Sequence, residues 1–172
     1  MPDRILVYGV TGSGKSTLAA RIAERTGLPW YALDDLMWEP GWIAAPPQEQ
    51  RRRVEAICAS ERWILDTAYL QWIDVPLARV ELIIGLDYPR WLSFSRLVRR
   101  TLSRVISLSP VCNGNIESLR LMLSRDSILL WQWHSFARKR NRIRLWATDP
   151  FGPAVVHLTS PGATRRWLAT LP

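Results

Sequence analysis

The residues with the clearest chemical meaning form one segment near the N-terminus, Gly9-Val10-Thr11-Gly12-Ser13-Gly14-Lys15-Ser16. It satisfies the pattern GxxxxGK[ST], in which glycines let the backbone bend so that successive N–H groups point at phosphate oxygens. Lys15 would then reach the outer phosphates and take part in catalysis, and the Ser16 hydroxyl would coordinate magnesium. The pattern predicts a site for a nucleoside triphosphate, most simply ATP, with Mg²⁺. The expected nucleotide contacts are Gly9, Thr11, Gly12, Ser13, Gly14, Lys15, Ser16 and Thr17.

The segments on either side of this loop support the prediction. Residues 5–8 form a short apolar run typical of a strand, and residues 16–25 have apolar positions at helical spacing. A helix that begins at the loop adds its positive dipole end to the phosphate site. The alternative is a glycine-rich turn without a nucleotide, which this context disfavours.

Three aspartates stand where apolar runs end. Asp66 closes the run that begins at Trp63, where an acidic group can hold magnesium or its water opposite the loop. Asp34 and Asp35 follow another run, and the carboxyl ends of parallel strands line the ligand crevice. We expect Asp34 to accept a hydroxyl proton from an acceptor or to orient a magnesium-bound water, and Asp35 to contact the substrate. The alternative for each is a turn or helix cap.

A stripe of arginines follows Pro89, on one face of a predicted amphipathic helix. Phosphoryl transfer spreads negative charge over the migrating group, and arginines on a mobile lid helix could stabilise that charge while excluding water. We expect Arg96 and Arg100 to be catalytic, and Arg99 and Arg104 to contact the nucleotide. The alternative is a solvated basic face, which we prefer for the second basic run at residues 138–144. The packing role on the first helix is predicted for Trp91, Phe94, Leu97, Val98, Leu102 and Val105.

Alternating strand and helix patterns predict the fold class. Nearly uninterrupted apolar runs are typical of parallel strands covered on both faces, and amphipathic helical patterns separate them. This predicts an α/β, three-layer fold with right-handed crossovers and helices on both faces of one parallel sheet. The expected strands are residues 5–8, 30–33, 63–66, 80–86 and 154–158. The expected helices are residues 16–25, 48–59, a helix after Pro89 through Val105, 119–136, and 161–167 capped by Ser160.

The composition limits what else the chain can be. At 172 residues we expect a single domain, residues 1–172, with a core large enough to fold without disulfides or a structural metal. Cys58, Cys112, His134 and His157 have no zinc-ligand spacing. The N-terminus lacks a signal-peptide pattern, and no apolar run reaches the roughly 18 residues that a membrane span requires. We therefore expect a cytoplasmic protein without a membrane partner.

The formal net charge of +8 attracts anions, which include nucleotide phosphates and nucleic acid. No helix-turn-helix spacing, zinc finger or RNA-binding aromatic pair is present, so nucleic acid is not an expected partner. The oligomeric state is left open.

Several further segments have a recognisable pattern. Residues 31–42, Tyr31-Ala32-Leu33-Asp34-Asp35-Leu36-Met37-Trp38-Glu39-Pro40-Gly41-Trp42, are similar to the motif LDxLxWxPGW. Three other matching segments are Arg62-Trp63-Ile64-Leu65-Asp66, Leu86-Asp87-Tyr88-Pro89-Arg90-Trp91 and Asn113-Gly114-Asn115-Ile116-Glu117-Ser118-Leu119. With the glycine loop and the arginine stripe, they resemble the bacterial P-loop kinase-like family labelled adenylate kinase and related kinases, or DNA topology modulation protein.

This resemblance implies the nucleoside monophosphate kinase fold. Its five-stranded parallel sheet has the order 2-3-1-4-5, with an arginine-bearing helical lid after the fourth strand, here residues 90–140 approximately. It also implies ATP as the phosphoryl donor, Asp34 near the acceptor hydroxyl and Asp66 as the Walker B-like aspartate. One segment departs from the family, which usually has Asp-Gly-Asn-Tyr where this chain has Asp66-Thr67-Ala68-Tyr69. An acceptor contact expected from the asparagine is then missing.

The leading hypothesis is a kinase that transfers the outer phosphate of ATP to a small-molecule or nucleotide acceptor. Asp35, Trp38, Trp42 and Tyr69 would contact this acceptor. A first alternative is an ATP-hydrolysing or ATP-sensing regulator without an acceptor, which the altered segment after Asp66 favours. A second is a nucleic-acid-binding module that uses both basic runs.

Overall fold

Five apolar segments pair side by side as one parallel sheet in the computed structural model of the protein, which describes residues 1–67, 69, 71–107, 110–116 and 127–171. The strand order is β2-β5-β1-β6-β9. Counted along the chain, this is the predicted order 2-3-1-4-5. The strands are β1 (Arg4–Gly9), β2 (Trp30–Ala32), β5 (Trp63–Thr67), β6 (Leu82–Leu86) and β9 (Ala154–Leu158).

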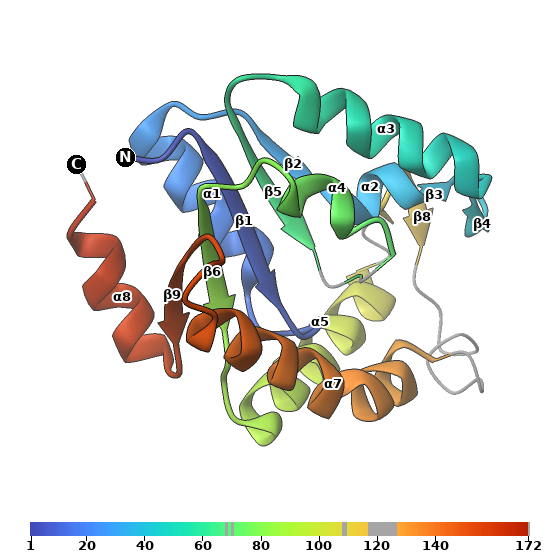
Figure 1. Ribbon diagram of the computed structural model, residues 1–172. Coiled ribbons are helices and arrows are strands. Elements are labelled where there is room, and N and C mark those ends of the chain that lie inside the picture. The colour runs from blue at the N-terminus through green and yellow to red at the C-terminus, as the bar shows by residue number, and fades with distance from the viewer. Residues whose placement is uncertain (68, 70, 108–109, 117–126, 172) are drawn as a thin grey trace.

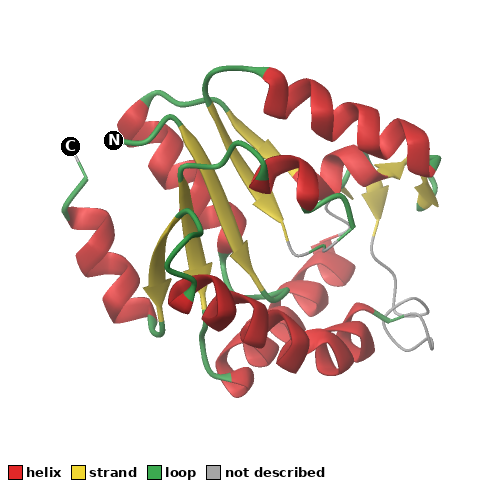
Figure 2. Ribbon diagram, viewed as in Figure 1, coloured by secondary structure: helices red, strands yellow, loops and turns green. Residues whose placement is uncertain are grey.

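The apolar runs are long because each strand contributes to two cores. Successive side chains of a strand point to opposite faces of a sheet. Ile5 and Val7 pack with α1 (Lys15–Thr26) and α8 (Pro161–Ala169) on one face. Leu6 and Tyr8 pack with α3 (Pro47–Ala59) and α7 (Ile128–Thr148) on the other. Figures 1 and 2 show the resulting three layers, with helices on both sides of the sheet.

Smaller elements lie beyond the carboxyl ends of the strands. Helix α2 (Leu33–Met37) begins where β2 ends, so Asp34 and Asp35 lie in its first turn and do not end the strand. The other helices are α4 (Asp74–Leu77) and α5 (Arg90–Ser107). Two antiparallel pairs complete the described elements, β3 (Trp38–Glu39) with β4 (Ile43–Ala44) and β7 (Pro110–Val111) with β8 (Asn115–Ile116). None of the helices in these residues is long and apolar enough to cross a bilayer.

Helix α7 differs from the predicted helix over residues 119–136. The start of that prediction lies outside the described residues, and the helix continues to Thr148. Ile143 and Trp146 remain on its buried face, so the basic run is part of the helix and does not end it. The interpretation of this run as a solvated face is wrong for Lys139, which is 1 % exposed.

The predicted packing face of α5 is correct for Leu97 and wrong for Trp91 and Leu102. Trp91 is 71 % exposed and Leu102 is 39 % exposed, whereas Ser93, Leu97 and Thr101 are buried at intervals of four residues. Two of these three residues are small and polar. Small side chains let the helix axis come close to whatever lies beneath it, and here the glycine loop lies beneath it.

A buried carboxylate joins α7 to the sheet. The Asp87 side chain follows β6 and is 1 % exposed. Arg140 Nε lies 2.6 Å from its Oδ1, and Arg144 Nε and His157 Nε2 lie 3.1 Å and 2.9 Å from its Oδ2. One carboxylate therefore connects two turns of α7 to β6 and β9.

We expect Asp87→Asn to lower the free energy of unfolding by about 2 kcal/mol, because two arginines lose their shared charged acceptor. Urea unfolding monitored by circular dichroism measures this change. Asp74→Asn is the matched control, since its ion pair with Arg51 is exposed and should contribute little. Equal destabilisation by both substitutions would contradict the anchoring role of Asp87.

Candidate functional site

The glycine loop joins the carboxyl end of β1 to the start of α1. Gly12 and Gly14 adopt positive φ angles of 82° and 95°, a conformation that side chains with a Cβ atom disfavour. The Ser13 N–H donates to the Val10 carbonyl at 3.1 Å, which closes the turn. The first N–H groups of α1 have no partner within the helix, so they can bind an anion at its positive end.

A cleft of about 590 Å³ opens beside this loop, a volume typical of small-molecule sites. Nine of the predicted site residues line it: Gly12, Ser13, Gly14, Lys15, Ser16, Thr17, Arg96, Arg100 and Arg104. The cleft thus brings the loop and the arginine stripe together. Gly9 and Thr11 are buried and are not among its lining residues, and Arg99 lies exposed outside the lining.

The remaining wall of the cleft was not predicted. It comes from α1, from Tyr88 before α5, and from α8, a helix that the sequence predicted over residues 161–167 without a role in the site. These lining residues are Leu18, Arg21, Tyr88, Pro161, Thr164, Arg165 and Leu168. A cleft with phosphate-binding groups at one end and this mixed apolar and basic wall suits an elongated anion.

Helix α5 rests directly on the loop. A Cβ atom at Gly12 would overlap the carbonyl oxygen of Ser93 and lie 3.0 Å from the Cβ of Leu97. From the same helix, Arg96 Nη1 donates to the Ser13 carbonyl at 3.4 Å, and its guanidinium lies 5.6 Å from the centre of the Tyr88 ring. This contact therefore fixes the distance between the arginines of α5 and the loop where phosphates would bind.

Charges of both signs meet at the foot of the cleft. Lys15 is only 9 % exposed, and its Nζ has a long contact of 3.4 Å to the Val10 carbonyl. Burial lowers the pKa of Lys15, while the carboxylates of Asp66 and Asp34 act in the opposite direction. Burial likewise raises the pKa of Asp66, which Lys15 opposes. A bound polyphosphate would favour the charged form of Lys15.

Asp66 and Ser16 fit a magnesium ion. Ser16 opposes the raised pKa of Asp66, which places its hydroxyl beside the carboxylate, and Trp30 Nε1 donates to Asp66 Oδ2 at 3.0 Å. Two oxygen donors beside a phosphate site are the ligands that Mg²⁺ prefers. Among the described residues there is no cluster of three or more His, Cys, Asp or Glu side chains suited to a metal.

The residues predicted to contact an acceptor also lie together. The Tyr69 hydroxyl interacts electrostatically with the Asp34 carboxylate and accepts a hydrogen bond from Trp38 Nε1 at 3.2 Å. Burial and the Asp34 carboxylate raise the pKa of Tyr69, so the phenol stays protonated. The Trp38 and Trp42 rings meet edge to face with centroids 5.8 Å apart. Three aromatic rings thus extend from the carboxylate that faces Lys15.

Two asparagines hold this segment in place. Asn113 Nδ2 donates to the carbonyls of Asp35 and Trp38, at 2.7 Å and 2.6 Å. Asn115 Oδ1 accepts from the Trp42 N–H at 2.7 Å, and its Nδ2 donates to the Glu39 carbonyl at 3.0 Å. The sequence marked them only through the family-like motif, whose last residues, Glu117 to Leu119, lie outside the described part of the chain, as does Ala68.

Comparison with known structures identifies the fold. The chain superimposes on a sugar kinase from a Janibacter species (TM-score 0.53, 20 % identity, 96 % of this chain and 91 % of that one). It also superimposes on a gluconokinase from Sinorhizobium meliloti (0.55, 19 %, 98 % and 90 %) and on a shikimate kinase from Acinetobacter baumannii in complex with shikimate (0.58, 16 %, 96 % and 88 %). No protein-family model and no curated protein sequence matches the chain. The protein therefore has the P-loop kinase fold.

We expect Gly12→Ala to weaken ATP binding by at least about tenfold, because the new methyl group would push α5 and its arginines off the loop. The positive φ adds a conformational cost of roughly 1–2 kcal/mol. Titration with a fluorescent ATP analogue measures the affinity, and urea unfolding measures the stability.

Gly27→Ala is the matched control for this substitution. Gly27 also has a positive φ, of 67°, but no atom lies within 4 Å of its added Cβ. It should lose stability without losing affinity for the nucleotide. If both variants bind ATP equally well, the contact between loop and helix does not position the site.

Proposed function

We propose that the protein is an ATP-dependent kinase that phosphorylates a hydroxyl group of a small molecule. The observation that carries this proposal is the position of Asp34, a carboxylate that interacts electrostatically with both Lys15 and Asp66 and that begins the aromatic wall of Tyr69 and Trp38. A nucleotide site alone would need neither the carboxylate nor the wall.

In the proposed reaction, an acceptor hydroxyl attacks the γ-phosphorus of ATP. A bond forms between the acceptor oxygen and phosphorus, and the bond from phosphorus to the bridging oxygen of ADP breaks. The hydroxyl proton passes to the Asp34 carboxylate, which acts as the general base. The products are ADP and the phosphorylated acceptor.

The cations around the cleft would stabilise the charge of the migrating phosphoryl group. Lys15 would contact the outer phosphates from the loop, while Arg96 and Arg100 would approach from α5 as a lid over the nucleotide. Magnesium, held by Ser16 and Asp66, would neutralise charge between the β- and γ-phosphates. Arg104 lines the same cleft and would contact the nucleotide beside them.

Two kinds of likeness support a small-molecule acceptor. The similar solved structures are kinases of sugars, gluconate and shikimate, although their low identity relates only the fold to this chain. The motif resemblance points instead to kinases related to adenylate kinase, with Asp34 and Asp66 in matching positions. Both agree on ATP as donor and differ on the acceptor. An ATP-hydrolysing regulator would leave the ordered aromatic wall without a role.

The first test is transfer of radiolabelled γ-phosphate from ATP to a panel of polyols, sugar acids and nucleosides. We expect one class of acceptor to be labelled and Lys15→Met to remove most of this activity in a folded protein, because a phosphate contact is lost. Asp34→Asn should reduce transfer by about 10²-fold or more while ATP still binds. ATP hydrolysis that no acceptor stimulates, and that Asp34→Asn leaves unchanged, would contradict the kinase assignment.

The second test separates turnover from binding. Arg96→Ala and Arg100→Ala should each lower turnover by about 10³-fold, by analogy with arginine fingers, and weaken ATP binding much less. Arg166→Ala, an exposed arginine of α8 outside the cleft lining, is the control. Normal turnover in both α5 variants would show that the stripe is a solvated face.

A further inference from the structure

The chain has lysine at only two positions, Lys15 and Lys139. The other 21 of its 23 basic residues are arginines. Both lysines are buried, Lys15 in the glycine loop and Lys139 on α7. The ammonium group of lysine is compact, and its charge responds to burial more readily than that of arginine. The second buried lysine has no part in the function proposed above.

Polar groups without partners line the buried face of α7. Gln132, Ser135 and Lys139 are 0 %, 3 % and 1 % exposed and lie on successive turns of this face. Among the described residues, the Gln132 amide, the Ser135 hydroxyl and the Lys139 amine have no hydrogen-bond partner. Buried polar groups are rarely left in this state unless water or a ligand binds them.

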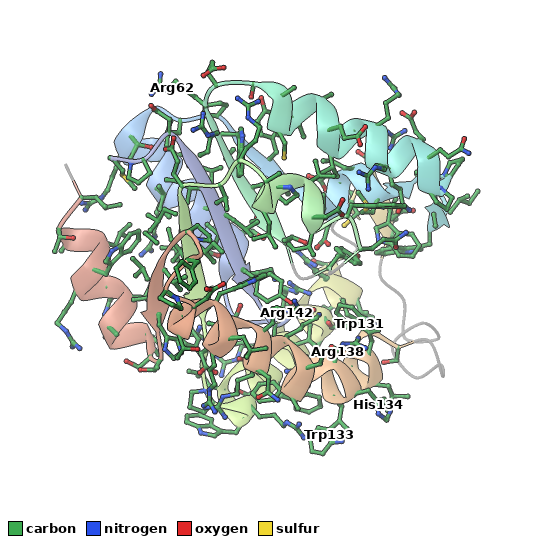
Figure 3. All side chains as sticks on the ribbon, viewed as in Figure 1. Arg62, Trp131, Trp133, His134, Arg138 and Arg142 are labelled. Carbon is green, nitrogen blue, oxygen red and sulfur yellow. The ribbon has the colours of Figure 1, made fainter. Side chains whose placement is uncertain are left out.

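These groups adjoin the acceptor side of the site. Lys139 Nζ lies 3.3 Å from the centre of the Trp131 ring, and that ring lies 6.0 Å from the ring of Tyr69, which interacts electrostatically with Asp34. Lys139 also interacts electrostatically with Lys15 and Asp34. Figure 3 shows Trp131 and Arg138 on the side of α7 toward the sheet, and Trp133 and His134 on the opposite side.

We infer that the acceptor carries an anionic group, a carboxylate or a phosphate, which Lys139 binds with hydrogen bonds from Ser135 and Gln132 while the acceptor hydroxyl faces Asp34. This inference rests on the proposed kinase function. Arg138 adds positive charge beside Lys139, and the Trp131 and Tyr69 rings would cover the carbon skeleton between the two ends.

The protonation of Lys139 is expected to depend on whether an anion is bound beside it. Burial, with Lys15 and Arg138 beside it, lowers the pKa of Lys139 to about 6, and Asp34 opposes this shift. The free amine is therefore mostly neutral near pH 8, and a bound anion would draw a proton onto it. Affinity for the anion should rise as the pH falls toward about 6 and change little below that value.

The test uses calorimetric titration of the protein saturated with Mg²⁺ and a non-hydrolysable ATP analogue, so that the loop is already occupied. The probes are gluconate, glucose 6-phosphate and the neutral polyol sorbitol. We expect at least one anionic probe to bind about tenfold or more tightly than sorbitol. Gluconate binding alone identifies a carboxylate, and glucose 6-phosphate binding alone identifies a phosphate.

Lys139→Met should remove this preference and the pH dependence of gluconate binding, while the matched variant His134→Ala, on the exposed face of α7, keeps both. Methionine is about as long as lysine and has no amine that needs a partner, so the melting temperature of Lys139→Met should be no lower than that of the unmodified protein. Lys139→Arg serves as a second variant. Sorbitol binding as tightly as the anions, absence of binding by both anions, or equal anion binding by Lys139→Met would each overturn the inference.

Phosphoryl transfer, measured with the same variants and probes but with hydrolysable ATP, separates this inference from the kinase proposal. Transfer to sorbitol that Lys139→Met does not change would overturn the anionic acceptor and leave the kinase. Binding of an anion through Lys139 without any transfer to it would contradict the kinase and leave the anion site.

Discussion

The close approach of α5 to the glycine loop is the constraint on which the rest of the site depends. Gly12 has no side chain, so the Ser93 carbonyl can rest against the loop, and the four-residue spacing of Ser93, Leu97 and Thr101 keeps the helix there. The arginines of the same helix then face the cleft at a height set by backbone contact. A larger residue on either surface would move the arginines of α5 relative to the loop.

The main features of the fold were predictable because each apolar run reflects the burial of a strand on both faces of the sheet. Ile5 and Val7 enter one core and Leu6 and Tyr8 the other, so a buried parallel strand is apolar at nearly every position. The loop motif is equally local, since its chemistry lies within eight consecutive residues. Order among the strands was reached through the family resemblance and is present in the structure.

Features that depend on distant partners were not predictable. Hydrophobic spacing assigned Trp91 to the core, but the surface that meets α5 is backbone, which selects small residues instead. The basic run of α7 resembled a solvated face because two of its arginines, Arg140 and Arg144, bind Asp87, which lies more than fifty residues earlier in the chain. Asn113 and Asn115 likewise bind backbone carbonyl groups about 75 residues away. Because every residue has such a carbonyl, the sequence does not indicate which ones are bound.

Because the sequence contains only two lysines, reagents that modify amines can distinguish individual positions in the protein. The two lysine side chains are both buried, Lys15 in the glycine loop and Lys139 on α7. Acylation at either position, located by mass spectrometry, therefore reports separately on how accessible the loop and the inner face of α7 are.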